Sequence, residues 1–252
     1  MSGNFVQRGD IAVMNKLDRA KLAVKSGADL VIEIPVSYCL APAEIYAKGA
    51  VYLLSAMGAV DEISFGSECG DIKKLSDALN FADTAVKNNM NDIQELMEKG
   101  YTYPRALTSV VMRYSEEAGE TILQPNNILA IEYMRAVNRY APDMKIFTVK
   151  RKSVQHDGEF SEDGFASASY IRKMLKADYN ISEQFTTPLW SSAIQTASEN
   201  GELADINRLE RIILYKLRTS TPEEISAVCD ISAGMEKRIY NARMAGSLDE
   251  LE

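Results

Sequence analysis

The hydrophobic and polar positions of the chain follow two periods in alternation. Three short, mainly apolar segments, 29–35, 61–65 and 145–149, predict strands, and a proline closes the first. Apolar residues recur at helical spacing through most of the chain between and beyond these segments, at 16–26, 42–57, 71–88, 91–99, 103–117, 128–138 and 168–176. Strands that alternate with helices are typical of a parallel α/β sheet with right-handed crossovers.

The pattern changes after residue 178. Residues 179–202 are rich in Ser, Thr and Asn, and three segments with helical spacing follow, at 205–217, 222–228 and 233–245. We therefore predict two domains, an α/β domain over residues 1–178 and a small helical domain over residues 179–252.

The composition is that of a folded protein, because 46% of the 252 residues are hydrophobic and 25% are charged. The net charge of -8 argues against a protein that coats nucleic acid without specificity. No apolar run approaches the roughly 18 residues that cross a bilayer, so we expect no membrane span. Three widely spaced cysteines and a single histidine indicate the reducing cytoplasm, and they exclude a disulfide framework and a histidine-based metal site.

Parallel α/β sheets bind ligands beyond the carboxyl ends of their strands, so the loops 1–10, 36–41, 65–70 and 150–167 are the places to look for a ligand. Gly66 lies there and would let a base or a ribose approach the backbone, although a turn glycine is the simpler explanation. Arg151, in the basic run 150–152, is suited to binding phosphate, and a solvated run of charge is the alternative.

Two helix starts carry further candidates. The side-chain amide of Asn126 is suited to a base edge or a ribose, but Asn126 or Asn127 could instead cap the helix that follows. Ser167, Ser169 and Arg172 surround the start of another helix, where backbone N–H groups and an arginine could bind phosphate. An ordinary N-cap with a solvated arginine is the alternative there.

Other residues give weaker signals. Arg8, Lys16 and Arg19 form a basic group near the first loop. His156 with Asp157 has the composition of a general base and its orienting carboxylate, but a lone loop histidine is more often structural or solvated. No catalytic residue can be assigned from these patterns.

Seven segments occur together in the order found in one family: Met-Ser-Gly-Asn-Phe-Val-Gln-Arg-Gly (1–9), Leu-Val-Ile-Glu-Ile-Pro (30–35), Ala-Glu-Ile-Tyr-Ala-Lys-Gly-Ala (43–50), Phe-Gly-Ser-Glu (65–68), Pro-Asn-Asn-Ile-Leu-Ala-Ile-Glu-Tyr (125–133), Val-Lys-Arg (149–151) and Ala-Ser-Ala-Ser-Tyr-Ile-Arg (166–172). On these motifs the chain resembles the bacterial tRNA(Met) cytidine acetate ligases. The resemblance is specific from residue 1 to about residue 178 and weak beyond it.

The resemblance implies a Rossmann-like nucleotidyltransferase sheet that lacks its first βα unit, followed by a small helical domain. It makes residues 1–178 an ATP-binding domain, incomplete at its N-terminus, and 179–252 an incomplete helical C-terminal domain. The implied activity joins acetate to ATP as acetyl-adenylate and then acetylates N4 of the wobble cytidine of elongator tRNA(Met).

Gly66, Asn126 and Arg151 match the family's ATP-contacting positions, and Ser167, Ser169 and Arg172 are further candidates for binding the nucleotide. The resemblance also implies acetate and elongator tRNA(Met) as partners. Mg²⁺ is expected with ATP, whose phosphates need it, and no metal-ligating residue is assigned in this chain.

The chain departs from the family in three ways. Its loop at 152–157 differs from the family's usual glycine-containing run, and its C-terminal domain stops early. The third departure is at the start of the chain. Family members begin with a strand and a Phe-His-Asn-Gly-His turn that holds the ATP phosphates, and this chain has a single histidine and no such turn. We therefore expect a sequence that lacks parts at both ends and is inactive alone. Two alternatives remain: a nucleotide- or RNA-binding remnant without catalysis, and a nucleotidyltransferase with another acceptor.

Overall fold

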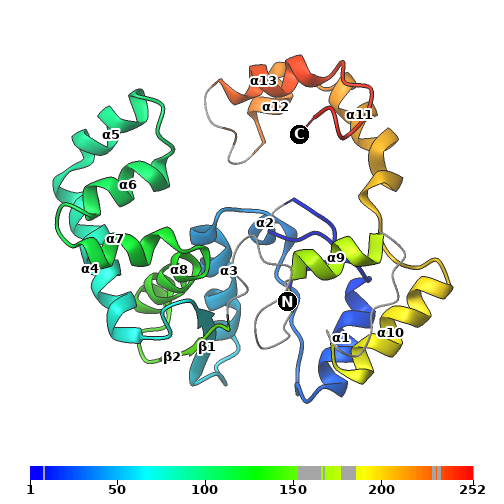
Figure 1. Cartoon of the computed structure of the whole chain (residues 1–252), viewed down its shortest axis with the longest axis horizontal. Helices are drawn as coiled ribbons and strands as arrows, with labels where there is room; N and C mark the ends of the chain where they lie inside the picture. Colours follow the sequence, from blue (N-terminus) through cyan, green and yellow to red (C-terminus); the bar gives the residue numbers. More distant parts are fainter. Residues whose placement is uncertain are drawn as a thin grey trace. The chain divides into compact units, whose positions relative to one another are not determined.

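The computed structural model describes residues 1–7, 9–152, 166, 168–176, 186–228, 231 and 234–251. The chain forms two compact units (Figure 1): Met1–Ile32 with Leu189–Glu252 make one, and Glu33–Pro188 make the other. The first residues of the chain thus group with its last helices. The division into functional domains at residue 178 stays a prediction.

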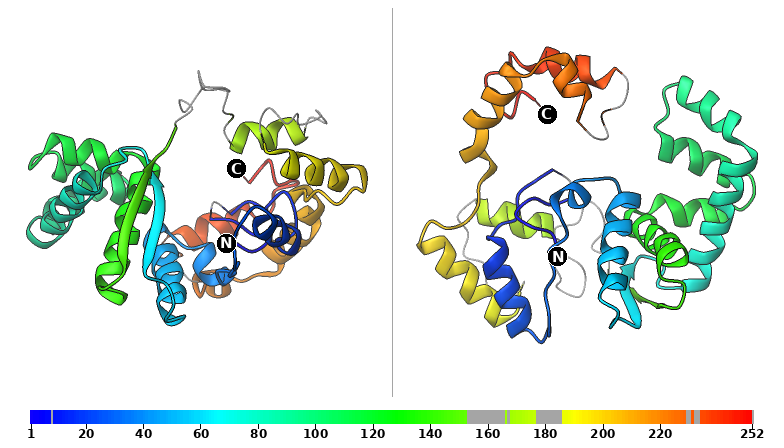
Figure 2. Two further views of the ribbon diagram at one scale, coloured as in Figure 1. Left: turned by 90° about the horizontal axis from the view of Figure 1, so that it is seen from below. Right: turned by 180° about the vertical axis from the view of Figure 1, so that it is seen from behind.

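The unit Glu33–Pro188 contains a parallel pair of strands. Strand β1 (Glu62–Ser67) pairs with β2 (Lys145–Lys150) in a register that runs from Glu62 opposite Lys145 to Ser67 opposite Lys150. The two strands lie side by side in Figure 2, left. The mixed α/β class and two of the three predicted strands are therefore confirmed, and both strands end at the same edge of the sheet.

Helices fill the rest of this unit. They are α2 (Val36–Cys39), α3 (Ala43–Ala56), α4 (Ile72–Asn88), α5 (Met90–Glu98), α6 (Tyr103–Val111), α7 (Glu116–Leu123), α8 (Pro125–Tyr140) and α9 (Ala168–Lys176). One helix predicted over 103–117 is in fact two, because Ser115 accepts the backbone N–H of Ala118 at 3.2 Å and starts α7. Such a side-chain cap replaces the hydrogen bond that would have continued α6.

Two apolar clusters hold these helices on the sheet. The larger joins α4, α5, α6, α7 and α8, and it includes Leu75, Ile93 and Val110, which are fully buried. The smaller joins α3 and α8 to β1 around Val51, Ile63 and Val137. Many members of both clusters are alanines, whose small side chains let helix backbones approach closely. Because α8 belongs to both clusters, its start is held in a set position relative to the sheet.

The strand predicted over 29–35 is wrong. Ile34 is buried and forms a single β-bridge, but residues 29–33 have no strand pairing, and the side chain of Leu30 is 61% exposed. Apolar alternation makes a segment compatible with a strand, yet a strand forms only where a neighbouring strand accepts its hydrogen bonds. Within the described residues, β1 and β2 are the only strands of the sheet.

The other unit is helical. It contains α1 (Lys16–Lys25), α10 (Pro188–Glu199), the 3-10 helix η1 (Ile206–Leu209), α11 (Glu210–Thr219), α12 (Pro222–Ser226) and α13 (Met235–Ala242). Hydrogen bonds from Ala204 N–H to the Val13 carbonyl at 2.8 Å, and from the Trp190 indole to Ser26 Oγ at 3.2 Å, join its two stretches of chain. Among the described residues no helix is long and apolar enough to cross a membrane.

Candidate functional site

The carboxyl ends of β1 and β2 bring together residues that are 85 positions apart in the sequence (66 and 151). The Arg151 N–H donates to the Ser67 carbonyl at 2.8 Å, so the pairing of the strands continues one residue past the end of β2. This hydrogen bond places the arginine beside the end of β1. Because β1 and β2 are parallel, the loops that follow them lie at one edge of the sheet.

Gly66 and Arg151 are in direct contact. A Cβ atom at Gly66 would lie 3.1 Å from Cγ and 3.5 Å from Cδ of Arg151. The arginine side chain therefore lies across the end of β1 where a larger residue would crowd it. Both residues are exposed, and Arg151 forms no ion pair with the described residues. The guanidinium is left able to bind an anion.

Glu68, just after β1, caps the helix that starts 57 residues later, at position 125. Its Oε1 accepts the backbone N–H of Asn126 at 3.0 Å and the side-chain Nδ2 of Asn126 at 2.6 Å. Its Oε2 accepts the backbone N–H of Asn127 at 2.7 Å. A carboxylate at a helix N-terminus is stabilised by the unpaired N–H groups and the helix dipole.

This contact corrects one prediction about the two asparagines. The N-cap residue of α8 is Gln124, and neither asparagine caps the helix with its side chain. Asn127 is instead buried, 2% exposed, and its Oδ1 accepts the N–H groups of Glu68 at 2.9 Å and Cys69 at 3.2 Å. Its Nδ2 donates to the Thr121 carbonyl at 3.1 Å. Asn127 therefore shapes the loop after β1 and has no amide group left for a ligand.

Asn126 is partly exposed and keeps a hydrogen-bonding group available. Its Nδ2 donates to Glu68, while its Oδ1 accepts no hydrogen bond from the residues the structure describes. Glu68 thus orients this amide and leaves the oxygen for a donor such as an adenine amino group or a ribose hydroxyl. The site that results joins the backbone at Gly66, the amide oxygen of Asn126 and the guanidinium of Arg151.

A buried hydroxyl pair supports this edge of the sheet, and the patterns in the sequence did not point to it. Ser67 Oγ lies 2.8 Å from Thr148 Oγ1 and accepts the Gly70 N–H at 3.0 Å. Gly70 has a φ of +63°, and a Cβ there would lie 2.4 Å from Cβ of Lys150. A glycine is therefore required both by the backbone conformation and by the close approach of β2. In the sequence, only Gly70 could have indicated this turn.

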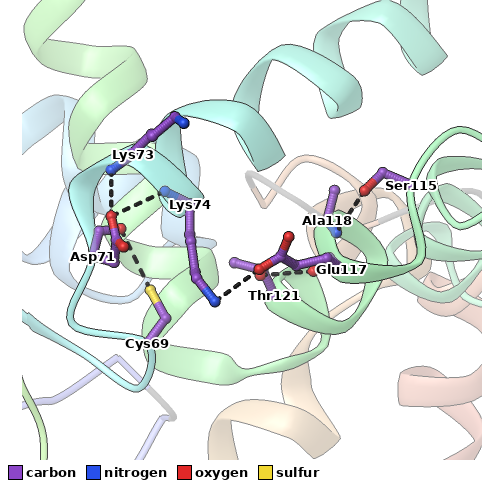
Figure 3. Close-up of polar contacts among 8 residues, drawn as sticks. All are labelled: Cys69, Asp71, Lys73, Lys74, Ser115, Glu117, Ala118 and Thr121. Atoms are coloured by element: carbon purple, nitrogen blue, oxygen red, sulfur yellow. Dashed lines mark hydrogen bonds and ion pairs between the residues drawn. The ribbon is translucent and has the colours of Figure 1, made fainter.

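The turn leads into the start of α4, which Figure 3 shows in detail. Asp71 caps α4 by accepting the N–H of Lys73 at 2.8 Å, and Cys69 Sγ lies 3.7 Å from the Asp71 carbonyl. Lys74 reaches from α4 to Glu117 on α7 at 2.7 Å, and the hydrogen bond with Glu117 raises the pKa of Lys74 above its ordinary value. This exposed ion pair adds little stability, so caps and core hold the helices.

Among the described residues, no hydrogen bond or ion pair joins Arg172 to this site. Ser169 and Arg172 lie on α9, where Arg172 is half-buried and forms no ion pair with the described residues. Ser167 lies outside the described residues, as do Arg8, His156 and Asp157.

The basic group near the first loop has a structural role in part. Arg19 donates to the backbone carbonyls of Met14 at 3.0 Å and Ser2 at 3.1 Å, and so holds the first loop against α1. Lys16 and Arg19 belong to the helical unit and not to the unit of the strands. Within the described residues no group of three His, Cys, Asp or Glu side chains could hold a metal ion.

The geometry suits a nucleotide in a definite way. Gly66 has no side chain of its own and has the aliphatic part of the Arg151 side chain beside it, and a phosphate can reach the exposed guanidinium at the same strand end. The one acidic side chain in contact with Asn126, Glu68, has both oxygens engaged by N–H groups.

Comparison with known proteins gives one consistent answer. A family model described as HIGH Nucleotidyl Transferase matches residues 1–252. A protein of Caldanaerobacter subterraneus named tRNA(Met) cytidine acetate ligase is 37% identical over 249 residues, which cover 96% of this chain and 61% of that protein. One of the same name from Acetivibrio thermocellus is 34% identical and is covered over 63% of its length.

Two solved structures are also similar to the chain. The crystal structure of Thermotoga maritima TmcAL in its apo form matches with a TM-score of 0.87 and 27% identity, over 99% of this chain and 61% of that one. A second crystal form, bound with alpha-thio ATP, matches with a TM-score of 0.85 over 60% of its chain. The chain thus spans about three fifths of the length of the relatives it matches.

Proposed function

Because the chain belongs to the HIGH nucleotidyl transferase family, we propose that it is the ATP-binding part of an acetate ligase acting on elongator tRNA(Met). The observation that carries the proposal is the contact between Gly66 and Arg151 at the ends of β1 and β2. Relatives with the name tRNA(Met) cytidine acetate ligase support the substrates. An acceptor tRNA also makes the cytoplasm the proposed location.

The reaction has two steps. An acetate oxygen attacks the α-phosphate of ATP, the bond to the β-phosphate breaks, and acetyl-adenylate and pyrophosphate form. The N4 amine of the wobble cytidine then attacks the acetyl carbon, loses a proton and releases AMP. Negative charge grows on the phosphate oxygens in the first step, and a fixed cation such as Arg151 stabilises it without reorganising.

Each residue of the site has a role in this proposal. The backbone at Gly66 receives the adenosine, Asn126 Oδ1 accepts a hydrogen bond from it, and Arg151 binds the phosphates. Ser167, Ser169 and Arg172, at the start of α9, are proposed to bind the phosphates from another side. Mg²⁺ is expected to arrive with ATP, whose phosphate oxygens are its usual ligands.

The chain alone is proposed to bind ATP without turning it over. With its single histidine it cannot supply the Phe-His-Asn-Gly-His turn to which the family resemblance assigns the phosphates. The test compares the chain alone with the chain joined to the segment that carries this turn in family members. Pyrophosphate release from ATP is measured with and without acetate and with elongator tRNA(Met) transcript.

Three outcomes separate the candidate functions. Pyrophosphate release that requires acetate, followed by N4-acetylcytidine in the tRNA, supports the ligase. Release without acetate indicates a nucleotidyltransferase with another acceptor. Binding of ATP with no turnover in the joined protein indicates a binding remnant, and turnover by the chain alone would show that the two-histidine turn is not needed.

A further inference from the structure

Helix α11 carries a basic face that the proposed nucleotide site does not use. At 100° per residue, six residues fall within about 160° of the helix circumference. They are Arg218, Arg211, Tyr215, Thr219, Ile212 and Lys216, and all six are exposed. The buried residue of the helix, Leu214, lies outside this arc. We propose that this face of α11 binds a single-stranded segment of RNA.

The charge on this face contrasts with that of the whole chain. Three of its six residues are cations and none is acidic, whereas the chain has a net charge of -8. Glu210, the one acidic residue of α11, is only partly exposed and accepts the Leu248 N–H at 3.1 Å. Arg211 and Lys216 form no ion pair with the part of the chain that the structure describes. Cations that are not paired with the described acidic side chains favour a polyanion.

The apolar side chains on the face indicate which polyanion. Tyr215 is 68% exposed, the most of any aromatic residue described, and Ile212 is 64% exposed. Tyr215 lies at the middle of the arc with cations on both sides of it. An exposed aromatic ring between cations is how proteins bind single-stranded nucleic acid, since the ring stacks on a base while the cations bind flanking phosphates.

The face is also held in place. Arg218 donates from Nε to the Arg243 carbonyl at 3.2 Å and from Nη2 to the Ala245 carbonyl at 2.8 Å, which ties α11 to the end of α13. The guanidinium of Arg243 in turn lies 3.8 Å from the centre of the Tyr240 ring. A rigid face loses little conformational freedom on binding.

A second copy of the chain is a poor occupant of this face, because a two-fold dimer would place two identical cationic faces together.

The choice of RNA rests on the proposed function, whose acceptor is a tRNA with an unpaired anticodon loop. The test therefore measures RNA binding by the 252-residue chain apart from turnover, with a fluorescently labelled elongator tRNA(Met) transcript. Fluorescence anisotropy is recorded over a range of salt concentrations. Circular dichroism checks that every variant is folded.

The variants separate charge from stacking. Arg211→Ala with Lys216→Ala should weaken binding and lower the slope of log affinity against log salt by about 1.4, which is about 0.7 for each lost phosphate contact. Tyr215→Ala should weaken binding by about 5- to 150-fold, and Tyr215→Phe should retain it because the ring still stacks. The matched controls are Lys99→Ala and Tyr52→Ala, both exposed in the other unit, and they should bind as the original chain does.

Several results would overturn the proposal. They are the absence of binding by the original chain, equal binding by the α11 variants and the controls, and a change in the oligomeric state of the α11 variants without a change in RNA affinity. The last would assign the face to a protein partner. ATP affinity and acetate-dependent turnover are measured on the same proteins. Loss of RNA binding in the α11 variants upholds the proposal even where no acetate-dependent turnover is found.

Discussion

Replacing Glu68 with glutamine tests the contact on which the candidate site depends. The two carboxylate oxygens of Glu68 accept three N–H groups from Asn126 and Asn127 at the start of α8. Glutamine has nearly the same shape but a single acceptor oxygen, and its NH₂ group must then point at a backbone N–H. The substitution Glu68→Gln therefore removes the charge and places the glutamine NH₂ group against a backbone N–H group, with no acceptor for either, and it creates no cavity.

The size of the effect follows from these contacts. Leaving one partly buried N–H group without an acceptor costs about 1–3 kcal/mol, and the loss of a negative charge at a helix N-terminus costs about 0.3–1 kcal/mol. Together these terms predict that Glu68→Gln lowers the free energy of unfolding by about 1–4 kcal/mol. Because Glu68 also orients the amide of Asn126, ATP affinity should fall as well.

Urea unfolding followed by circular dichroism measures the loss of stability. The matched control is Glu117→Gln, which neutralises an exposed glutamate paired with Lys74 on the surface. Exposed ion pairs contribute little, so the control should unfold almost as the original protein does. If Glu68→Gln unfolds at the same urea concentration as Glu117→Gln, the capping of α8 by Glu68 does not stabilise the fold as described.

Three further predictions concern the same unit. Arg151→Ala should weaken ATP binding by about 1.5–3 kcal/mol, as expected for a lost charge-assisted hydrogen bond, and should leave urea unfolding unchanged. If calorimetry gives an unchanged dissociation constant for ATP, residues 150–152 are a solvated run of charge. Asn127→Ala should destabilise the protein by at least about 2 kcal/mol, because the N–H groups of Glu68 and Cys69 lose their acceptor. Unfolding by urea tests this, and a smaller loss would contradict it. The hydrogen bond with Glu117 raises the pKa of Lys74 above its ordinary value. The small contribution of this pair is therefore present below the ordinary lysine pKa and is lost as the pH rises through the raised pKa. Lys74→Met should lose slightly less stability than the original protein over that alkaline range, and a larger loss in alkaline unfolding curves would contradict the contact.

The sequence by itself determined most of the local structure. Helical periodicity located most of the helices but missed α10, which lies in the Ser-, Thr- and Asn-rich segment 179–202. Short apolar runs located β1 and β2, and the parallel arrangement followed from their alternation with helices. The motif residues Gly66, Asn126 and Arg151 could also be named in advance. These features depend on neighbours along the chain, because periodicity and turn residues act over a few positions.

Tertiary structure alone decided the features that depend on distant partners. The capping of α8 by Glu68 joins residues 58 positions apart, and the contact of Gly66 with Arg151 depends on the register of β1 against β2. The failure of 29–35 to form a strand has the same cause, since nothing in its own pattern says whether a neighbour will pair with it. A local pattern sets which conformations a segment can adopt, and the hydrogen bonds and packing of the folded chain select among them.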